Sequence, residues 1–399
     1  MAIVKFVEVC EKIGSGATPR GGKEAYSDEG ISLVRSQNVL DFSFSSDGLV
    51  HINDEQAKKL KNVELHPDDV LLNITGDSVA RACIMDSSFL PARVNQHVAI
   101  VRGKKELVLN SYILYYLQWK KDYLLQLASA GATRNALTKG MIEQLDINLP
   151  SLTEQKRIVA VLDSIQQKIS VNKKINDNLQ QQAAAIFRSW FVDCAPFGGK
   201  APDEWKNVTL EDITALISRG ITPKYADDTD QIVINQKCIR NHTIDLSLAR
   251  THTPKVINEK WLRFGDLLIN STGDGTLGRA AQVWFQPKNL TVDSHVTIAR
   301  PAKENLIFYI GLWGILHEKE IESLHTGSTG QTELPRDRVK AMELRLPDND
   351  TLDRFNALIT PMATAIVANQ EENNRLAALR DAILPKLMSG EIDVSAVQL

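Results

Sequence analysis

The strongest constraint on the fold is that the chain repeats itself. Residues 69–77 read Asp-Val-Leu-Leu-Asn-Ile-Thr-Gly-Asp, and residues 266–274 read Asp-Leu-Leu-Ile-Asn-Ser-Thr-Gly-Asp, an offset of 197. Three further pairs of segments keep the same order: 16–19 with 220–223, 94–98 with 292–296, and 146–150 with 343–347. Four matched segments in one order predict a structural unit that is present twice, with small differences in loop length.

Each copy ends in a long amphipathic segment. Apolar residues recur there in alternating steps of four and three, a heptad pattern that predicts a coiled coil. Arg380 is the one charged residue at these positions, and Pro361 should kink the second helix or delay its start. The heptad positions of the first segment are Ile158, Leu162, Ile165, Ile169, Leu179, Ala183, Ile186 and Trp190, and those of the second are Phe355, Ile359, Met362, Ile366, Leu376, Arg380, Ile383 and Leu387.

Both apolar patterns are interrupted at matching places near mid-helix. If the two helices pair antiparallel, four asparagines meet in one central polar layer: Asn172, Asn176, Asn369 and Asn373. A buried asparagine layer costs stability but fixes register and orientation. The alternative is that each helix packs only on its own globular part.

The globular parts, here called heads, are expected to be mixed α/β. Short runs rich in β-branched residues alternate with Gly, Pro, Asn and Asp, and one helix follows them in each copy, at residues 111–128 and 304–317. The predicted strands are 31–34, 70–74 and 98–101, then 232–234, 267–269 and 296–299. The predicted domains are head one (1–150), helix one (151–193), a Pro- and Gly-containing linker (194–206), head two (207–347), helix two (348–390) and a tail (391–399), related by an internal pseudo-twofold.

Composition narrows the class of protein. The 399 residues are 43% hydrophobic, enough for a core in each copy, and no apolar run approaches the length of a membrane span. The four scattered cysteines contain no C-x-x-C pair, which fits a reducing compartment and argues against structural zinc. With a net charge of −3, binding to DNA requires basic residues gathered on one face or charge supplied by partners.

No catalytic constellation is predicted. Residues 273–278 fit G-x-G-x-x-G, but residues 279–285 look like a strand, whereas a dinucleotide site needs a helix there. Residues 202–206 resemble a nuclease carboxylate–lysine cluster only superficially, because the acidic residues are adjacent. His97 and His295 recur at one strand in each copy without nearby metal ligands, so we interpret them as structural.

Three stretches resemble the specificity subunit of type I restriction–modification systems, the HsdS family. They are residues 137–155, which contain Leu-Pro-Ser-Leu-Thr-Glu-Gln before the first helix, residues 186–205 at its end, and residues 379–391 at the end of the second helix. In order, and with the duplicated heads, they extend the resemblance over the whole chain. One departure is that the second Leu-Pro passage continues as Asp348-Asn-Asp-Thr351 without Glu-Gln.

This resemblance implies a subunit without catalysis of its own. Each head would be a target recognition domain for one half of a split double-stranded DNA site, and the antiparallel helices would set the spacing and dock two methyltransferase subunits. Two motor–nuclease subunits would complete the restriction complex. S-adenosylmethionine, ATP and Mg²⁺ would be bound by these partners and no cofactor by this chain, which would be cytoplasmic and DNA-associated in a bacterium or archaeon. The alternatives are a stand-alone DNA methyltransferase or nuclease, and a coiled-coil scaffold that binds only proteins.

The DNA-contacting residues are expected on polar loops of the heads, because bases are read by Arg, Lys, Asn, Gln, Ser and Thr side chains. Features shared by both heads suit phosphate contacts or scaffolding, and features that differ suit base reading. The candidates of the first head are Arg20, Lys23, Arg35, Gln37, Asn38, Thr75, Asp77, Ser78, Arg81, Thr133, Arg134 and Asn135. Those of the second head are Arg219, Lys224, Asn235, Gln236, Lys237, Arg240, Asn241, Thr272, Asp274, Thr276, Arg279, Ser328, Thr329, Gln331 and Thr332.

Overall fold

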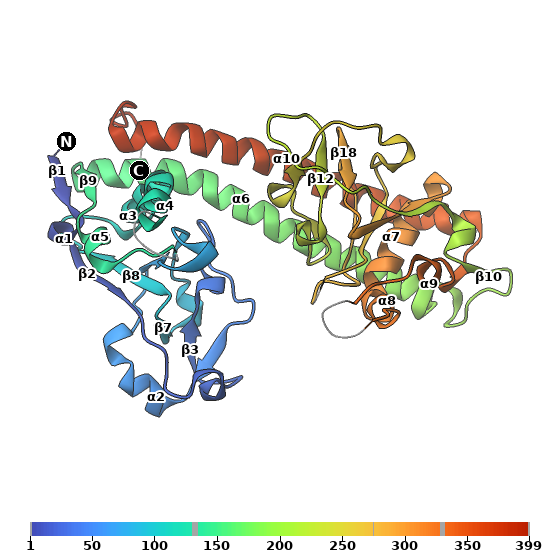
Figure 1. The fold of residues 1–399 in the computed structure, drawn as a ribbon, viewed down its shortest axis with the longest axis horizontal. Helices are drawn as coiled ribbons and strands as arrows, with labels where there is room; N and C mark the ends of the chain where they lie inside the picture. Colours follow the sequence, from blue (N-terminus) through green and yellow to red (C-terminus); the bar gives the residue numbers. More distant parts are fainter. Residues whose placement is uncertain (1, 130–134, 274, 328–331, 398–399) are drawn as a thin grey trace. The chain divides into compact units, whose positions relative to one another are not determined.

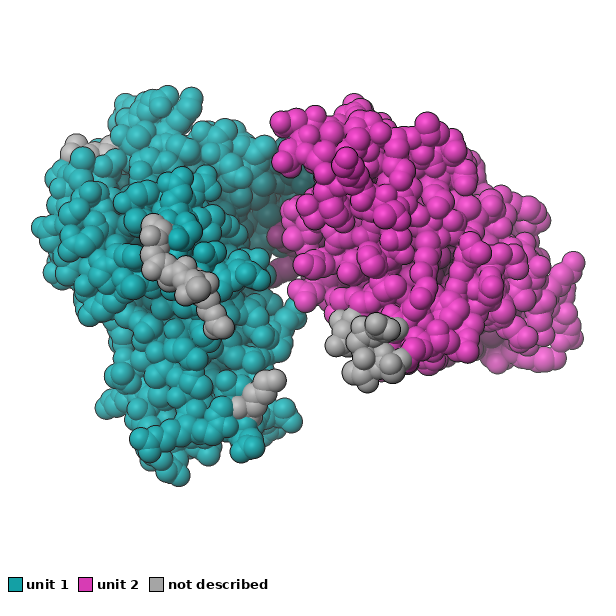
Figure 2. All heavy atoms as spheres, in the orientation of Figure 1, with its two compact units in different colours: residues 1–170, 373–399 teal, residues 171–372 magenta. Residues whose placement is uncertain are grey.

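The chain forms two compact units, each built from one head and segments of both long helices (Figures 1 and 2). Unit 1 comprises residues 1–170 and 373–399, and unit 2 comprises residues 171–372. The computed structural model describes residues 2–129, 135–273, 275–327 and 332–397. In this described part, no helix combines the length and the apolar character that crossing a membrane requires.

The described residues of the head of unit 1 form three small sheets. A four-stranded antiparallel sheet has the order β2-β8-β5-β6, a mixed sheet has the order β4-β3-β7 with β3 and β7 parallel, and β1 pairs antiparallel with β9. The strands are β1 Ala2–Lys5, β2 Cys10–Ser15, β3 Ile31–Val34, β4 Val50–Ile52, β5 Val70–Asn73, β6 Ala82–Ile84, β7 Ala92–Val94, β8 Val98–Gly103 and β9 Asp146–Leu149. The helices are α1 Phe6–Val9, α2 Asp54–Lys59, α3 Asn110–Trp119, α4 Lys121–Ser129 and α5 Lys139–Glu143.

The head of unit 2 has the same topology. Its sheets have the orders β11-β19-β16-β17, β15-β12-β18 and β10-β20, with β12 and β18 parallel, and a short hairpin β13-β14 is added. The strands are β10 Lys206–Thr209, β11 Thr214–Arg219, β12 Ile232–Ile234, β13 Ile239–Arg240, β14 Thr243–Ile244, β15 Arg250–Thr251, β16 Leu267–Asn270, β17 Ala280–Gln282, β18 Leu290–Val292, β19 Val296–Pro301 and β20 Glu343–Leu346. The helices are α7 Ile307–Leu316, α8 Glu318–Ser323 and α9 Arg336–Lys340. The predicted duplication of mixed α/β heads is therefore confirmed.

A buried ion pair recurs at the centre of each head. Asp69, fully buried before β5, accepts two hydrogen bonds from the guanidinium of Arg102 at 2.5 and 2.6 Å. Asp266, before β16, accepts two from Arg300 at 2.8 and 2.7 Å. Each pair joins the end of one central strand to the start of its neighbour, which explains why the repeated segments begin with aspartate. A bidentate carboxylate–guanidinium pair of this kind fixes geometry as well as charge.

The repeated Gly-x-Thr-Pro segment reflects a close backbone approach. A Cβ atom at Gly16 would lie 2.0 Å from the carbonyl oxygen of Val94, and one at Gly220 would lie 1.9 Å from that of Val292. The following amides, of Ala17 and Ile221, donate to the same two carbonyls. Only glycine leaves room for the chain to pass the parallel strand at this distance.

Two long helices, α6 (Leu152–Phe187) and α10 (Asn349–Ser389), each contribute to both units. In unit 1, the apolar core contains Ile158 and Leu162 of α6 together with Leu384 and Leu387 of α10. Arg380, the charged heptad residue, donates to Gln166 at 2.8 Å. Because later residues of α10 meet earlier residues of α6, the two segments run antiparallel.

In unit 2 the later part of α6 packs against the earlier part of α10. Its core joins Ala183 and Phe187 to Phe355 and Ile359, again antiparallel. The predicted coiled coil is therefore present. The alternative, that each helix packs only on its own head, is wrong, because the end of α10 packs in the core of unit 1 and the end of α6 packs in the core of unit 2.

Polar side chains interrupt this apolar contact. Asn369 donates to the side-chain oxygen of Asn176 at 2.8 Å, and Asn176 donates to the carbonyl of Ile366 at 3.3 Å. Asn172, fully buried, donates to Glu372 at 2.7 Å. Asn373, the fourth asparagine of the predicted layer, belongs to unit 1.

One expectation about the helices is wrong, and another is wrong in part. The helix predicted at 111–128 is divided at Lys120, where ψ is 12° and the backbone leaves the helical region. The sequence pattern does not mark this break, because apolar residues recur on both sides of it. The helix α10 starts at Asn349 and continues through Pro361, so the start of the helix is not delayed, and a kink at Pro361 stays a prediction. Pro361 lies on the exposed face of the helix, away from the core.

The end of α6 and the linker are held by aromatic contacts. A π-helical turn, Arg188–Val192, follows α6, and the ring centroid of Phe191 lies 4.9 Å from that of Tyr309 and 4.8 Å from that of Phe355. Trp205, which is 7% exposed, lies 5.7 Å from Phe191. Trp205 thus ties the linker to Phe191, which packs edge-to-face on Tyr309 of α7 and Phe355 of α10.

We predict that Asp69→Asn lowers the stability of unit 1 strongly. It would leave the guanidinium of Arg102 without its buried counter-charge and with only the half-exposed Glu11 at 3.7 Å, at a cost of about 3–5 kcal/mol. Thermal and urea unfolding of the full chain should show an early transition, and Asp266→Asn should do the same for unit 2. Glu55→Gln, which removes an exposed pair with Lys59, is the control and should leave unfolding unchanged. Unaltered unfolding of Asp69→Asn would contradict a structural role for this pair.

The Asn176–Asn369 contact predicts a non-additive pair of substitutions. Asn369→Leu alone leaves the buried oxygen of Asn176 without a donor, which costs about 1–3 kcal/mol. The double variant Asn176→Leu/Asn369→Leu removes both polar groups and should recover most of that stability. A double-mutant cycle by chemical unfolding measures the coupling. Additive losses from the two single variants would show that the hydrogen bond does not couple the helices.

Candidate nucleic-acid interface

In unit 1, the predicted contact loops meet at one end of β5. The buried side chain of Asn73 donates to the carbonyls of Ser36 and Val39 at 2.9 and 3.2 Å, which holds the loop after β3. The amide of Gly76 donates to the carbonyl of Asn135 at 3.2 Å, which holds the segment before α5. Segments that are far apart in the sequence therefore form one loop surface.

Unit 2 assembles the equivalent surface with equivalent bonds. Asn270 donates to the carbonyl of Gln236 at 3.0 Å, and the amide of Leu334 donates to the carbonyl of Ser271 at 2.8 Å. Arg219, at the end of β11, forms an ion pair with Glu333 at 2.5 Å and donates to the carbonyl of Leu334 at 2.9 Å. The loops containing residues 219, 236, 272 and 333 thus lie together.

The two repeated histidines hold these loops. Thr75 and Nδ1 of His97 are hydrogen-bonded at 2.7 Å, and Thr272 and Nδ1 of His295 at 2.6 Å. This contact fixes the threonine of each Thr-Gly-Asp segment and supports the structural interpretation of both histidines.

Most predicted contact residues in the described part have exposed or partly exposed side chains. The exposed ones are Arg20, Gln37, Asp77, Asn135, Lys224, Lys237, Arg240 and Asn241. The partly exposed ones are Arg35, Thr75, Ser78, Arg81, Arg219, Gln236, Thr272, Thr276, Arg279 and Thr332. Lys23 lies in the short 3-10 helix Gly22–Ala25, and its side chain is outside the described part. The residues outside the described part are Thr133, Arg134, Asp274, Ser328, Thr329 and Gln331.

Two predicted contact residues are buried, which does not fit base reading. Asn38 has no exposed surface, donates to the carbonyls of Ser45 and Asp47 at 2.9 and 3.1 Å, and accepts from the amide of Arg35. Asn235, 8% exposed, donates to the carbonyl of Leu248 at 3.1 Å. Both amides hold their loop in shape, and a base contact would require those bonds to break. We therefore assign them a structural role.

Some of the cationic side chains among the predicted contact residues already form hydrogen bonds or ion pairs within the chain, and others do not. Arg279 donates to the carbonyl of Gly275 at 2.7 Å, and Arg219 is engaged as described above. Within the described residues, Arg81, Lys237 and Arg240 form no side-chain hydrogen bond or ion pair. These three keep their full capacity to bind phosphate oxygens or base edges.

Two cations near Arg219 were not predicted from the sequence. A polar cavity of about 340 Å³ is bordered by Arg219, Lys260, Glu333 and Arg336. Nζ of Lys260 donates to the carbonyl of Gly220 at 3.0 Å. Lys260 and Arg336 stand in segments without a motif, so only the folded chain shows that they extend the basic part of this surface.

The described residues contain no group of three or more His, Cys, Asp or Glu side chains placed to hold a metal ion. All four cysteines are buried, and burial raises the pKa of the Cys10 and Cys83 thiols to about 12, so neither is a thiolate at neutral pH. The glycine-rich segment is followed by strand β17 rather than a helix, as expected. Gly278 is required there because a Cβ atom would lie 2.9 Å from the backbone of Glu322.

Comparison with known proteins gives consistent results along the chain. Residues 1–181 match the family model for the type I restriction modification DNA specificity domain. The chain is 25% identical to the type I restriction enzyme MjaIX specificity subunit of Methanocaldococcus jannaschii, over 98% of this chain and 93% of the relative. It is 21% identical to the HindI specificity subunit of Haemophilus influenzae, over 91% of this chain and 94% of the relative.

A solved structure shares the fold. The crystal structure of the type I restriction–modification system S subunit from M. genitalium matches with a TM-score of 0.55 at 12% identity, covering 97% of this chain and 96% of the other. At this identity the likeness concerns the fold: duplicated mixed α/β domains with two long helices.

The stability of unit 2 is expected to depend on pH through Asp293, which lies beside His295. Asp293, 2% exposed, accepts from the amide of His295 at 2.9 Å, and burial raises the pKa of its carboxyl group. Unit 1 has neutral Asn95 in the corresponding role, accepting from the amide of His97 at 3.1 Å. A group whose pKa is raised by folding stabilises the fold at low pH, and that stability is lost as pH rises through the raised pKa.

Asp293→Asn should therefore stabilise unit 2 at pH 7, by about 2–4 °C in Tm for each kcal/mol regained. The gain should disappear in buffers below pH about 4, where the aspartate is protonated. Thermal unfolding at both pH values provides the measurement. An equal gain in Tm at both would show that the buried charge is not its source.

Proposed function

Since this chain belongs to the family of type I restriction–modification DNA specificity subunits, we propose that it is the DNA-reading subunit of a modification complex. Each head binds one half of a bipartite, asymmetric double-stranded site. The chain itself has no catalytic activity and binds no cofactor.

This proposal rests on one observation: the loops of the two heads share a backbone structure but expose different side chains. The amide of Ser45 donates to the carbonyl of Asn38 at 2.8 Å, and the amide of Asp245 donates to the carbonyl of Cys238 at 2.8 Å, an offset of 200 residues. At the same offset, exposed Gln37 corresponds to exposed Lys237. Two heads with one backbone and different donors suit two different half-sites.

The helices suit a role as a spacer. The 36 residues of α6 correspond to about 54 Å at 1.5 Å per residue, which is long enough to reach over the ~34–36 Å between half-sites one helical turn apart. Two methyltransferase subunits dock on the coiled coil, and two motor–nuclease subunits join the full complex. S-adenosylmethionine, ATP and Mg²⁺ are bound by these partners, and the complex acts on DNA in the cytoplasm of a bacterium or archaeon.

Lys237→Gln tests the assignment of heads to half-sites, because it gives unit 2 the side chain that unit 1 carries at Gln37. Loss of a good base contact costs about 1–3 kcal/mol, so one position of one half-site should become relaxed. The methylated positions are mapped by sequencing the DNA of cells that express the variant with its methyltransferase partner. Lys288→Gln, an exposed lysine between β17 and β18, is the matched control and should leave the pattern unchanged.

Changes in both half-sites would contradict the assignment of one head to each half. The other functional classes are separated by the purified chain: methylation or cleavage of DNA without partners would indicate a stand-alone enzyme. Absence of sequence-selective DNA binding in the presence of the methyltransferase would indicate a protein-only scaffold.

A further inference from the structure

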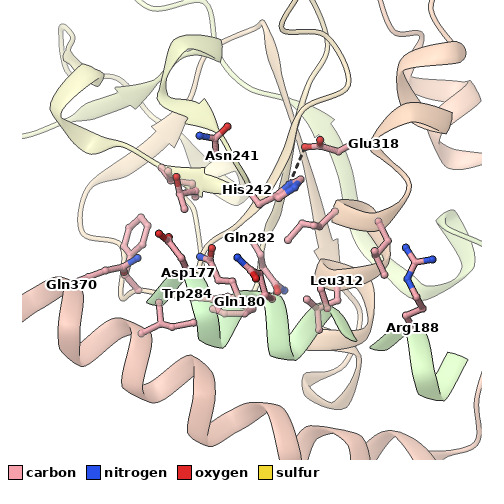
Figure 3. Close-up of a pocket in the computed structure, with 18 of the residues that line it drawn as sticks. Asp177, Gln180, Arg188, Asn241, His242, Gln282, Trp284, Leu312, Glu318 and Gln370 are labelled. Atoms are coloured by element: carbon pink, nitrogen blue, oxygen red, sulfur yellow. Dashed lines mark hydrogen bonds and ion pairs between the residues drawn. The ribbon is translucent and has the colours of Figure 1, made fainter. Parts of the chain in front are cut away.

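Unit 2 contains a cavity of about 760 Å³ between its head and the segments of the two long helices that belong to it. Gln180 of α6 and Gln370 of α10 lie on one side, and the turn containing Asn241 and His242 lies on the other (Figure 3). The side chain of Trp284 forms part of the apolar wall. The volume of this cavity is in the range of those that enclose small organic ligands.

The corresponding place in unit 1 is filled by the chain itself. Phe42 is the counterpart of His242 at the offset of 200 residues, and both have a left-handed backbone, with φ of 61° and 59°. The ring of Phe42 packs against Tyr115, with centroids 6.1 Å apart, and the guanidinium of Arg380 lies 4.0 Å from the ring centroid. A planar ring and a planar cation thus occupy this space in unit 1.

Unit 2 carries smaller side chains at each of these positions. His242 replaces Phe42, and at the offset of 197 residues Leu312 replaces Tyr115 and Ala183 replaces Arg380. Leu312 and His242 line the cavity. The cavity therefore lies at the place that Phe42 fills in unit 1, while Ala183 belongs to the adjoining core and does not itself line the cavity.

Unit 2 also adds hydrogen-bonding groups around the cavity. On α6 and the π-helical turn that follows it, three polar residues line the cavity, whereas α10 has Ala or Pro at the equivalent positions, 197 residues later. They are Gln180, Gln181 and Arg188, and the residues that correspond to them in the other repeat are Ala377, Ala378 and Pro385. If the cavity were a packing defect, the residues that line it would be as apolar as those at the filled place in unit 1. Instead, the cavity of unit 2 has gained hydrogen-bond donors and acceptors.

The turn over the cavity is held in place. Asn241 and His242 both have positive φ, 50° and 59°, and connect β13 to β14 as a two-residue turn of the I′ kind. Nδ1 of His242 lies 3.2 Å from the carboxylate of Glu318, and this contact raises the pKa of His242. At the place of Glu318, unit 1 has Lys121 paired with Asp41, so both units secure this turn by a polar contact with the same helix position.

We propose that the cavity binds a nucleotide, that is, a planar heteroaromatic ring with hydrogen-bonding substituents and an attached phosphate. The ring would take the place that Phe42 holds in unit 1 and lie against Trp284. The carboxamides of Gln180 and Gln181 offer both donors and acceptors to the edge of a base. Arg188 and Lys319, exposed cations that line the cavity, would bind the phosphate. This inference concerns a small-molecule site and is independent of how the heads read DNA.

The test is calorimetric titration of the full chain with AMP, GMP, CMP and UMP at millimolar concentration. We expect saturable, one-to-one binding of at least one of them. Ala184→Phe, which places a ring in the cavity from α6, should abolish that binding. Ala185→Phe is the matched control, because residue 185 is exposed and does not line the cavity, and it should bind as the native chain does.

A second variant protects the test against misfolding of Ala184→Phe. Gln180→Ala/Gln181→Ala changes two partly or fully exposed side chains and should weaken binding about tenfold or more, with unchanged thermal unfolding. Arg188→Ala should weaken binding of the nucleotide but not of the matching nucleoside. The proposal is overturned if none of the four nucleotides binds saturably, or if the glutamine variant binds as tightly as the native chain.

Discussion

Each head depends on a helix segment contributed by the other half of the chain. The core of unit 1 contains Leu384 and Leu387 from the end of α10, and the core of unit 2 contains Ala183 and Phe187 from the end of α6. Since burial of a large apolar side chain contributes about 1.5–3 kcal/mol, neither head keeps its stability without the other repeat's helix. The antiparallel contact of α6 and α10 is therefore a condition for both cores.

This dependence separates the fixed and variable parts of the molecule. The repeated elements are buried: the Asp–Arg pair, the asparagine at the end of β5 or β16, and the glycine beside the parallel strand. They fix where the loops begin and end but leave the exposed side chains free to differ, as Gln37 and Lys237 do. The space between head and helices also differs between the units: unit 1 has Phe42 and Arg380 there, and unit 2 has a cavity.

The sequence predicted what depends on periodicity and repetition. The heptad pattern located both helices and the polar positions within them, and runs rich in β-branched residues located the strands β3, β5, β8, β12, β16 and β19. It did not predict the pairing of β1 with β9 or of β10 with β20, because a four-residue strand carries little pattern of its own. Lys260 and Arg336 join the loop surface only through folding. Asn38 and Asn235 were placed among the DNA contacts because their polarity is visible in the sequence, whereas their burial is not.

The central claim is that each head reads one half-site independently while the helices hold the two together. It is tested most directly by replacing residues 1–150 with the corresponding head of another specificity subunit and mapping the methylated positions in cells that contain the methyltransferase. The account predicts that one half-site changes to that of the donor head while the other half-site and the spacing remain. A change in both half-sites, or in neither, would contradict it.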